Sequence, residues 1–538
     1  MQRPKSPERR GVQAAVPSRP TRPLRSALAA GLLTAVSLLP RVAEAFCGFY
    51  VGSADASLYN HATQVVLMRE GTRTVLSMTN NYQGPPQDFA MVVPVPIVLQ
   101  KENVKTLSHE LFNRIDRLDA PRLVEYWEHD PCQEPYGYDF SDDPLTSGGF
   151  GPNDATIRER PAPPVEVLNR FAVGEYQIVI LGAQDSLALG AWLRQNGYRI
   201  PSGAEAVLRP YVQSGMKFFV AKVDPAKVRF WKPTMATLSP LRFHYDTEAF
   251  SLPVRLGLLS SAGTQDLIVH ILARGQRYEV ANYDNVVIPT NLDVKDAAKS
   301  RFGAFYASLF DHTLKLHPRA VVTEYAWAAI KCDPCPTPPL DDEDLAAFGA
   351  SLLPASDPAA GLNATFVLTR LHARYDKDAL GDDLVFRAAP PITGGREERD
   401  ASGALEQGVS NGSFNNFQAR YAMRHAWAGE VKCSRPRRGV WGSRSGAEPA
   451  QNVAFVEDRG SVNWESFLGD ARPEGGTSAS RWALPPILPP PPPHSGCAGC
   501  RVGEGETGAG DRSGISFLAM VAAATLVRRR WENQSCSR

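Results

Sequence analysis

The residues whose chemistry is easiest to recognise are Cys332 and Cys335, which form a C-x-x-C motif. Such a pair performs thiol–disulfide exchange when it begins a helix, because that position lowers the pKa of one thiol. Three prolines lie between 336 and 339, so we expect no helix to begin here. We therefore favour a structural disulfide. A redox motif and a zinc site that adds Cys433 and a histidine are the alternatives.

Two further motifs lack parts that their chemistry requires. His109 and Glu110 begin the zinc-protease pattern H-E-x-x-H, but Asn113 stands where the second histidine is needed. Residues 408–412 match G-x-S-x-G, yet their flanks are not the strand and helix of a nucleophile elbow, and we expect a flexible loop. We therefore expect no catalytic residue and no cofactor.

Residues 369–375 alternate polar and apolar side chains. In a strand, alternate residues share a face, so Arg370, His372 and Arg374 would form a cationic row. Such a row could bind an anionic ligand. We favour the alternative that the row is solvated or paired with the acids at 376, 378, 382 and 383.

The best-defined elements lie in residues 185–223, which predict helix, turn, helix, turn and strand. Gly197 and Gly215 can end the two helices, because glycine adopts the left-handed conformation at low cost. Ser202 with Glu205 fits a capping box for the second helix. These apolar residues predict packing, so function should lie on the loops around them.

The remaining chain alternates irregularly between strand and helix signals. We expect helices over 104–118 and 293–316 and a long surface loop over 131–164. Strands are expected at 63–68, 74–78, 89–93, 176–182, 254–259, 266–273, 286–288, 321–327, 365–371 and 384–387. Without a regular βαβ repeat, this order predicts an α+β fold with mainly antiparallel β-sheet and several packed helices.

The N-terminal residues have the features of a secretory signal. In residues 1–45 a basic region precedes an apolar run over 27–39, which is shorter than the ~20 residues that span a bilayer. An A-x-A cleavage site ends at Ala45, so the mature chain would begin at Phe46. The alternative is an uncleaved anchor.

Export would place the cysteines in an oxidising compartment, where disulfides persist. Cys47 with Cys132 is a plausible pair, although sequence does not fix connectivity. The disulfide candidates are Cys47, Cys132, Cys332, Cys335 and Cys433.

The rest of the chain divides by composition. Residues 46–441 form the expected globular domain, as one large domain or as two closely packed subdomains, 46–290 and 291–441. Residues 442–496 are a low-complexity linker, in which 485–493 is almost pure proline and therefore a stiff spacer. The 538-residue chain has a formal charge of +1, which argues against a nucleic-acid partner.

Residues 497–538 contain Cys497, Cys500 and Arg501, an apolar run over 515–527 and then three arginines. This order resembles the myxobacterial C-terminal sorting tail (MYXO-CTERM). The resemblance implies recognition at the cysteine motif, removal of the apolar segment and anchoring at the cell surface. The alternative is a short transmembrane anchor that is retained.

Several segments of the globular part together resemble domain-of-unknown-function family 2330, a family of exported bacterial proteins. They are the start at 46–49, the run 88–96, the segments 192–198 and 211–223, and the motif 332–335. Met91 departs from the aromatic residue expected there. The resemblance implies no activity, cofactor or catalytic residue.

These features predict an exported protein, surface-anchored or secreted, that binds a partner or an envelope component without catalysis. The expected partners are the export and C-terminal sorting machinery and, through the tail, a membrane. The alternative is an exported enzyme or metal-binding protein that uses cysteine and histidine residues of the second half.

Overall fold

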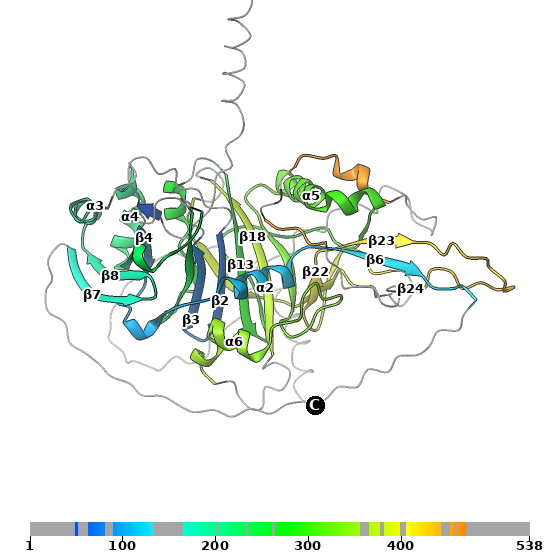
Figure 1. The fold of residues 1–538 in the computed structure, drawn as a ribbon, viewed down its shortest axis with the longest axis horizontal. Coiled ribbons are helices and arrows are strands. Elements are labelled where there is room, and N and C mark those ends of the chain that lie inside the picture. The colour runs from blue at the N-terminus through cyan, green and yellow to red at the C-terminus, as the bar shows by residue number, and fades with distance from the viewer. Residues whose placement is uncertain are drawn as a thin grey trace, which may run out of the picture. The chain divides into compact units, whose positions relative to one another are not determined.

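The computed structural model describes residues 49–51, 63–80, 90–132, 165–198, 200, 203–232, 235–260, 264–355, 365–376, 381–398, 405–442, 452–456, 458 and 460–469 (Figure 1). The predicted signal peptide, Cys47, the proline run and the predicted sorting tail with its apolar segment lie outside the described residues. No helix within the described ranges is long and apolar enough to cross a membrane.

Strands dominate the described part, five α-helices accompany them, and the predicted α+β class is confirmed. One five-stranded sheet is antiparallel throughout. Its strands are, in order across the sheet, β1 (Phe49–Val51), β4 (Ala90–Val95), β9 (Lys217–Val223), β8 (Tyr176–Ala183) and β7 (Val165–Val173). Helices α3 (Ser186–Gln195) and α4 (Ala204–Gln213) contribute apolar residues to a core on one face of it.

A larger sheet carries the candidate site. Its main path is β10 (Arg229–Lys232), β11 (Met235–Asp246), β3 (Arg73–Asn80), β2 (Thr63–Glu70), β13 (Gln265–Arg274), β18 (Phe366–Tyr375), β17 (Val321–Ala328), β22 (Asn416–Gln418), β20 (Ile392–Gly394) and β21 (Val409–Asn411). Strands β5 (Val104–Thr106) and β15 (Asn285–Val287) pair with β11 and β17. The central ladder joins β13 and β18 over ten antiparallel residue pairs.

Two small sheets complete the described strands. One contains β12 (Ser251–Leu252), β19 (Leu384–Ala389) and β14 (Arg277–Val280). The other contains β16 (Leu292–Asp293), β23 (Arg420–His425), β6 (Arg122–Glu128) and β24 (Trp441–Gly442). In the second sheet β23 and β6 are parallel, although nearly 300 residues separate them in the chain.

The two faces of the larger sheet are covered differently. One face shares a core with the five-stranded sheet, and that core draws on residues from both sides of position 290. The other face is covered by α2 (His109–Asp119) and α6 (Asp342–Phe348) in one core and by α5 (Phe302–Leu316) in another. Because side chains alternate along β18, Leu371 and Ala373 enter the first core, and Arg370 and His372 point toward the helices.

Four expectations for local structure are wrong. Residues 104–118 are not one helix: β5 is followed by α2, which begins after the N-cap Ser108. Residues 254–259 are a 3₁₀-helix, η4 (Arg255–Ser260), rather than a strand, since a short apolar run fits either. The helix expected from 293 begins at Phe302, after β16 and the 3₁₀-helix η5 (Asp296–Arg301). The G-x-S-x-G segment contains β21 and is not a flexible loop.

The helix ends predicted for residues 185–223 are partly correct. Helix α3 begins after Asp185, whose side chain accepts a hydrogen bond from the Ala188 N–H at 2.8 Å. Gly197 and Gly215 follow the two helices with positive φ. The capping box is wrong, because the N-cap of α4 is Gly203 at a φ of 85°, and no side chain caps there.

Described residues between 452 and 469 pack against the rest of the fold although they fall within the stretch expected to be linker. Phe467 of η8 (Trp464–Phe467) and Leu468 join the core beneath α5, and Val456 packs against Ile268 of β13. An isolated bridge also joins Leu468 to Val294. The packed part of the chain therefore extends beyond Trp441.

Candidate functional site

The three residues of the predicted cationic row share one face of β18, but they are not a solvated surface. Arg370 is 1% exposed and His372 is 4% exposed. Their acidic partners lie on α2, β17, β13 and α5. These partners are not the acids at 376, 378, 382 and 383 that the sequence suggested. We call these partners and the row together the charge network.

Arg370 lies at the centre of the charge network. Its Nη1 donates to Asp116 Oδ1 at 2.6 Å and to Asp119 Oδ1 at 2.8 Å, and its Nε donates to Glu324 Oε2 at 2.7 Å. Burial disfavours the guanidinium charge, but the three carboxylates outweigh burial and raise the pKa of Arg370. A buried cation with three charge-assisted partners fixes α2 and β17 to β18.

A β-bulge directs Glu324 into this site. The pairing of β17 with β18 shifts between Thr323 and Tyr325, so Glu324 is the extra residue. Its carboxylate contacts Arg370, His372 and the hydroxyl of Tyr306. Burial opposes ionisation, yet His372 and Arg370 together lower the pKa of Glu324 to about 2.

His372 lies between two carboxylates. Its Nδ1 is 2.8 Å from Glu324 Oε1, and its Nε2 is 3.1 Å from Asp266 Oδ1. Both carboxylates have lowered pKa values and can only accept, so both ring nitrogens must donate and the ring is an imidazolium. Burial disfavours that charge, but the two acids outweigh it and raise the pKa of His372. The ring stacks on Phe310 of α5, with centroids 3.8 Å apart.

The network reaches the surface at Arg374. Its Nε donates to Asp266 Oδ1 at 2.7 Å, and its Nη1 pairs with Asp311 of α5. The side chain of Asp311 is 58% exposed. The charges therefore alternate in sign from the interior between the two helices to solvent beside α5.

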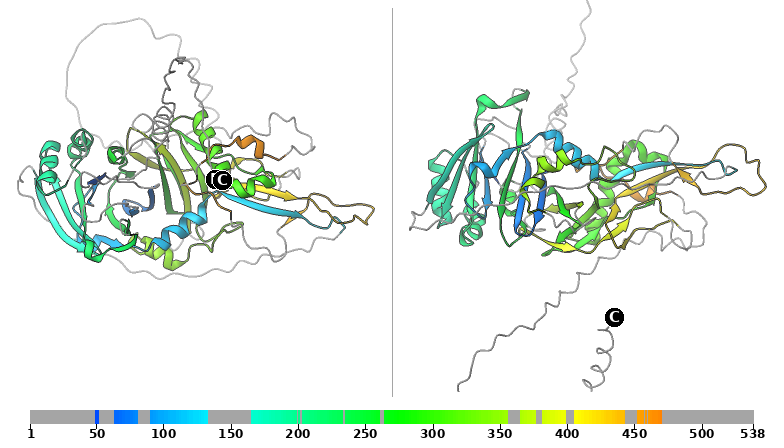
Figure 2. Two further views of the ribbon diagram at one scale, coloured as in Figure 1. Left: turned by 45° about the horizontal axis from the view of Figure 1, so that its top comes forward. Right: turned by 90° about the horizontal axis from the view of Figure 1, so that it is seen from below.

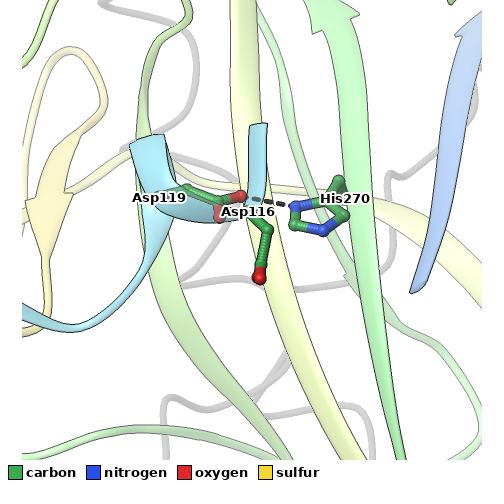
Figure 3. A group of neighbouring side chains, drawn as sticks. All are labelled: Asp116, Asp119 and His270. Atoms are coloured by element: carbon green, nitrogen blue, oxygen red, sulfur yellow. Dashed lines mark hydrogen bonds and ion pairs between the residues drawn. The ribbon is translucent and has the colours of Figure 1, made fainter. Parts of the chain in front are cut away.

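At the inner end, Asp116, Asp119 and His270 form a group that could hold a metal ion (Figure 3). All three are buried, with candidate ligand atoms within 4.8 Å of one another. His270 Nδ1 is already hydrogen-bonded to Asp119 Oδ2 at 2.7 Å, and both carboxylates contact Arg370. Because both carboxylates already serve as partners of that guanidinium, we assign this group to the charge network.

The structure contains two disulfides within its described residues, Cys132–Cys433 and Cys332–Cys335. The expected pairing of Cys132 with Cys47 is wrong, because Cys132 bonds to a cysteine 301 residues away. The zinc hypothesis for Cys332, Cys335 and Cys433 loses its ligands, because thiolates coordinate zinc and these sulfurs are oxidised.

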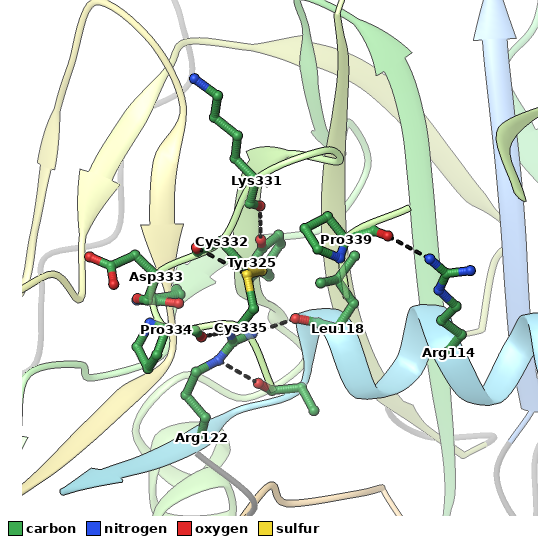
Figure 4. The surroundings of a disulfide bond; sticks show 12 residues. Arg114, Leu118, Arg122, Tyr325, Lys331, Cys332, Asp333, Pro334, Cys335 and Pro339 are labelled. Carbon is green, nitrogen blue, oxygen red and sulfur yellow. Dashed lines mark hydrogen bonds between the residues drawn. A yellow bond between two sulfur atoms is a disulfide. The ribbon is translucent and has the colours of Figure 1, made fainter. Parts of the chain in front are cut away.

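The Cys332–Cys335 loop is held by side chains from four other elements (Figure 4). Within the loop, the carbonyl oxygens of Asp333 and Pro334 accept hydrogen bonds from Gln418 and Arg122. On either side of it, the carbonyl oxygens of Lys331 and Pro339 accept from Tyr325 and Arg114. Arg122 is fully buried and also donates to the carbonyl of Leu118 at 2.5 Å. The loop therefore satisfies a buried charge next to α2 and does not begin a helix.

The other two motifs also have structural roles. His109 Nε2 is 2.7 Å from the carbonyl oxygen of Leu238, which ties α2 to β11. The Ser410 hydroxyl is 3.1 Å from the hydroxyl of Thr393 across the β20–β21 pair. Neither contact involves a base or a second ligand.

The fold and the charge network define an α+β protein whose most concentrated ionisable groups are internal and paired. A model of the bacterial family DUF2330, described as uncharacterized proteins conserved in bacteria, matches residues 41–387. The chain belongs to this family, and the matched region contains the whole charge network. No curated protein and no solved structure matches the chain.

Proposed function

We propose that the protein is exported, is anchored at the cell surface and binds a partner there without catalysing a reaction. One observation carries the non-catalytic part: the cations of the charge network are already paired with carboxylates, and two of them, Arg370 and His372, are buried. A general acid or base must reach the proton that it transfers. Groups enclosed between a sheet and two helices do not meet that requirement.

The export part is supported by the sequence signals and by the disulfides. Two disulfides occur among the described residues, and such bonds persist mainly in oxidising compartments. The signal-like residues 1–45 and the sorting-tail resemblance at 497–538 supply the route out and the anchor.

The test is labelling of intact cells with a membrane-impermeant biotin reagent. We expect the full chain to be labelled before lysis, whereas a variant that ends at Pro493 should be released into the medium. Mass spectrometry should show that the surface form of the protein lacks Val527. Labelling only after lysis would contradict export, and an intact Val527 would contradict processing of the tail.

The second candidate, an exported metal-dependent or thiol-dependent enzyme, is tested on the purified chain. We expect thiol counting to find Cys132, Cys332, Cys335 and Cys433 oxidised and metal analysis to find no stoichiometric ion. A bound ion that is lost in an Asp119→Asn variant would instead favour a metal site at the inner end of the network.

A further inference from the structure

A different set of charges lies on an extension built from two distant segments, residues 122–132 and 420–442, which we call the arm. Strands β6 and β23 run parallel along the arm, and β24 pairs with the edge of β6 that faces away from β23. The arm extends away from the larger sheet in Figure 1 and in both views of Figure 2. The Cys132–Cys433 disulfide joins the two segments beyond the strands.

A buried acid holds the outer part of the arm in one conformation. Glu128 accepts hydrogen bonds from the backbone N–H groups of Gly439 and Trp427, at 2.8 and 3.0 Å, and from Arg438 at 3.1 Å. Burial opposes the charge, but these donors lower the pKa of Glu128. The Arg437 N–H also donates to the carbonyl of Pro131 at 2.9 Å. Residues 427–439 are therefore preorganised.

This outer part presents cations that are not neutralised. Lys432 and Arg438 have acidic partners, Glu430 and Glu128. Arg435 and Arg437 are exposed, and their side chains make no ion pair with another described residue. Two free guanidinium groups two residues apart form a site for carboxylates, since each can bind one carboxylate in a bidentate manner.

We propose that the end of the arm binds an anionic polysaccharide that carries carboxylate groups, a proposal that rests on the surface location proposed above. An exposed ion pair contributes little to binding, so a partner with one charge would bind weakly. A polymer with repeated carboxylates overcomes this limit, because many anchored copies bind it at once. The region 427–439 is not helical and lacks the apolar helix face with which peripheral proteins enter a bilayer.

The test measures binding of polygalacturonate to the purified, disulfide-intact full chain immobilised at high density, with dextran as the uncharged control. We expect binding to polygalacturonate alone and its loss as salt rises, since salt screens exposed charges. The Arg435→Glu/Arg437→Glu variant should lose at least about tenfold in affinity, because two charge-assisted contacts become repulsive. Its melting temperature should be unchanged.

The matched control is Arg209→Glu/Lys315→Glu, which reverses two exposed charges on α4 and α5 and should keep wild-type affinity. Equal losses in both variants, no binding by the wild type, or equal binding to dextran would overturn the proposal. Binding to phosphatidylglycerol vesicles but not to polygalacturonate would overturn it in favour of a membrane surface. Because the assay uses purified protein, these failures are distinct from a failure of surface labelling.

Discussion

Arg370 and Arg437 carry the same guanidinium group in opposite settings. Arg370 is enclosed between β18 and α2 and contacts three carboxylates. Arg437 lies at the end of the arm, exposed, with only its backbone hydrogen-bonded. The Arg370 guanidinium is already bound by carboxylates of the fold, so it stabilises the fold. The Arg437 guanidinium is hydrated and needs no internal partner, so a binding partner can reach it. The charge network and the arm therefore divide stability from recognition.

The largest expected effect comes from Arg370→Met, which removes the buried cation and keeps a side chain of similar length. Three carboxylates would lose their shared partner, so unfolding in urea should show a loss of about 3–5 kcal/mol. The control is Arg209→Met on the exposed face of α4, which should change stability by less than about 0.5 kcal/mol. Equal effects of the two substitutions would show that the charge network does not serve the fold.

The two disulfides extend the comparison to covalent links. Loop entropy favours the pair that is 301 residues apart over the pair that is three apart. We expect Cys132→Ser/Cys433→Ser to cost about 4 kcal/mol and Cys332→Ser/Cys335→Ser about 2 kcal/mol in urea unfolding. The reverse order would mean that the carbonyls that hold Arg122 matter more than the closure of the arm.

The charge network should make the free energy of unfolding depend on pH. The folded pKa of His372 is raised above its ordinary value, so its stabilisation is complete below about pH 6.5 and is lost as pH rises through the raised value. The total loss is about 1.4 kcal/mol for each pH unit that separates the unfolded pKa from the folded pKa. Urea unfolding from pH 5.5 to 9 should show this decline in the wild type. The His372→Gln variant should lack it, and His317→Gln should keep it. A decline that persists in His372→Gln would assign it to another group.

The smallest effect on stability is expected at the arm. Arg435→Ala/Arg437→Ala removes two side chains that no described residue pairs with, so the free energy of unfolding should change by less than about 0.5 kcal/mol. A thermal melt beside the wild type checks this. A loss above about 1 kcal/mol would show that these arginines support the fold and are not reserved for a partner.

Much of the fold could be predicted from the sequence because it depends on local patterns. The alternation at 369–375 correctly placed Arg370, His372 and Arg374 on one face. Their partners could not be predicted, because Asp116 and Asp119 reach the row from a helix about 250 residues earlier.

Two signals for those partners were present and were missed. Asp266 begins and His270 interrupts the apolar stretch of strand β13, where a polar residue must find a partner if it is buried. Glu324 similarly interrupts β17, although the bulge that turns it inward leaves no mark in the sequence. Residues 453–456 and 460–469 include apolar and aromatic side chains, but their packing was missed because low-complexity sequence flanks them on both sides.

The most direct test of the division between network and arm is the protonation state of His372. Selective ¹⁵N labelling of histidine in the deuterated chain, assigned with His372→Gln, reports both ring nitrogens at pH 7.5. We predict that both are protonated and that excess Zn²⁺ leaves their shifts unchanged, because each donates to a carboxylate. A neutral ring with one bare nitrogen would contradict the closed network and would make His372 available for metal binding or proton transfer.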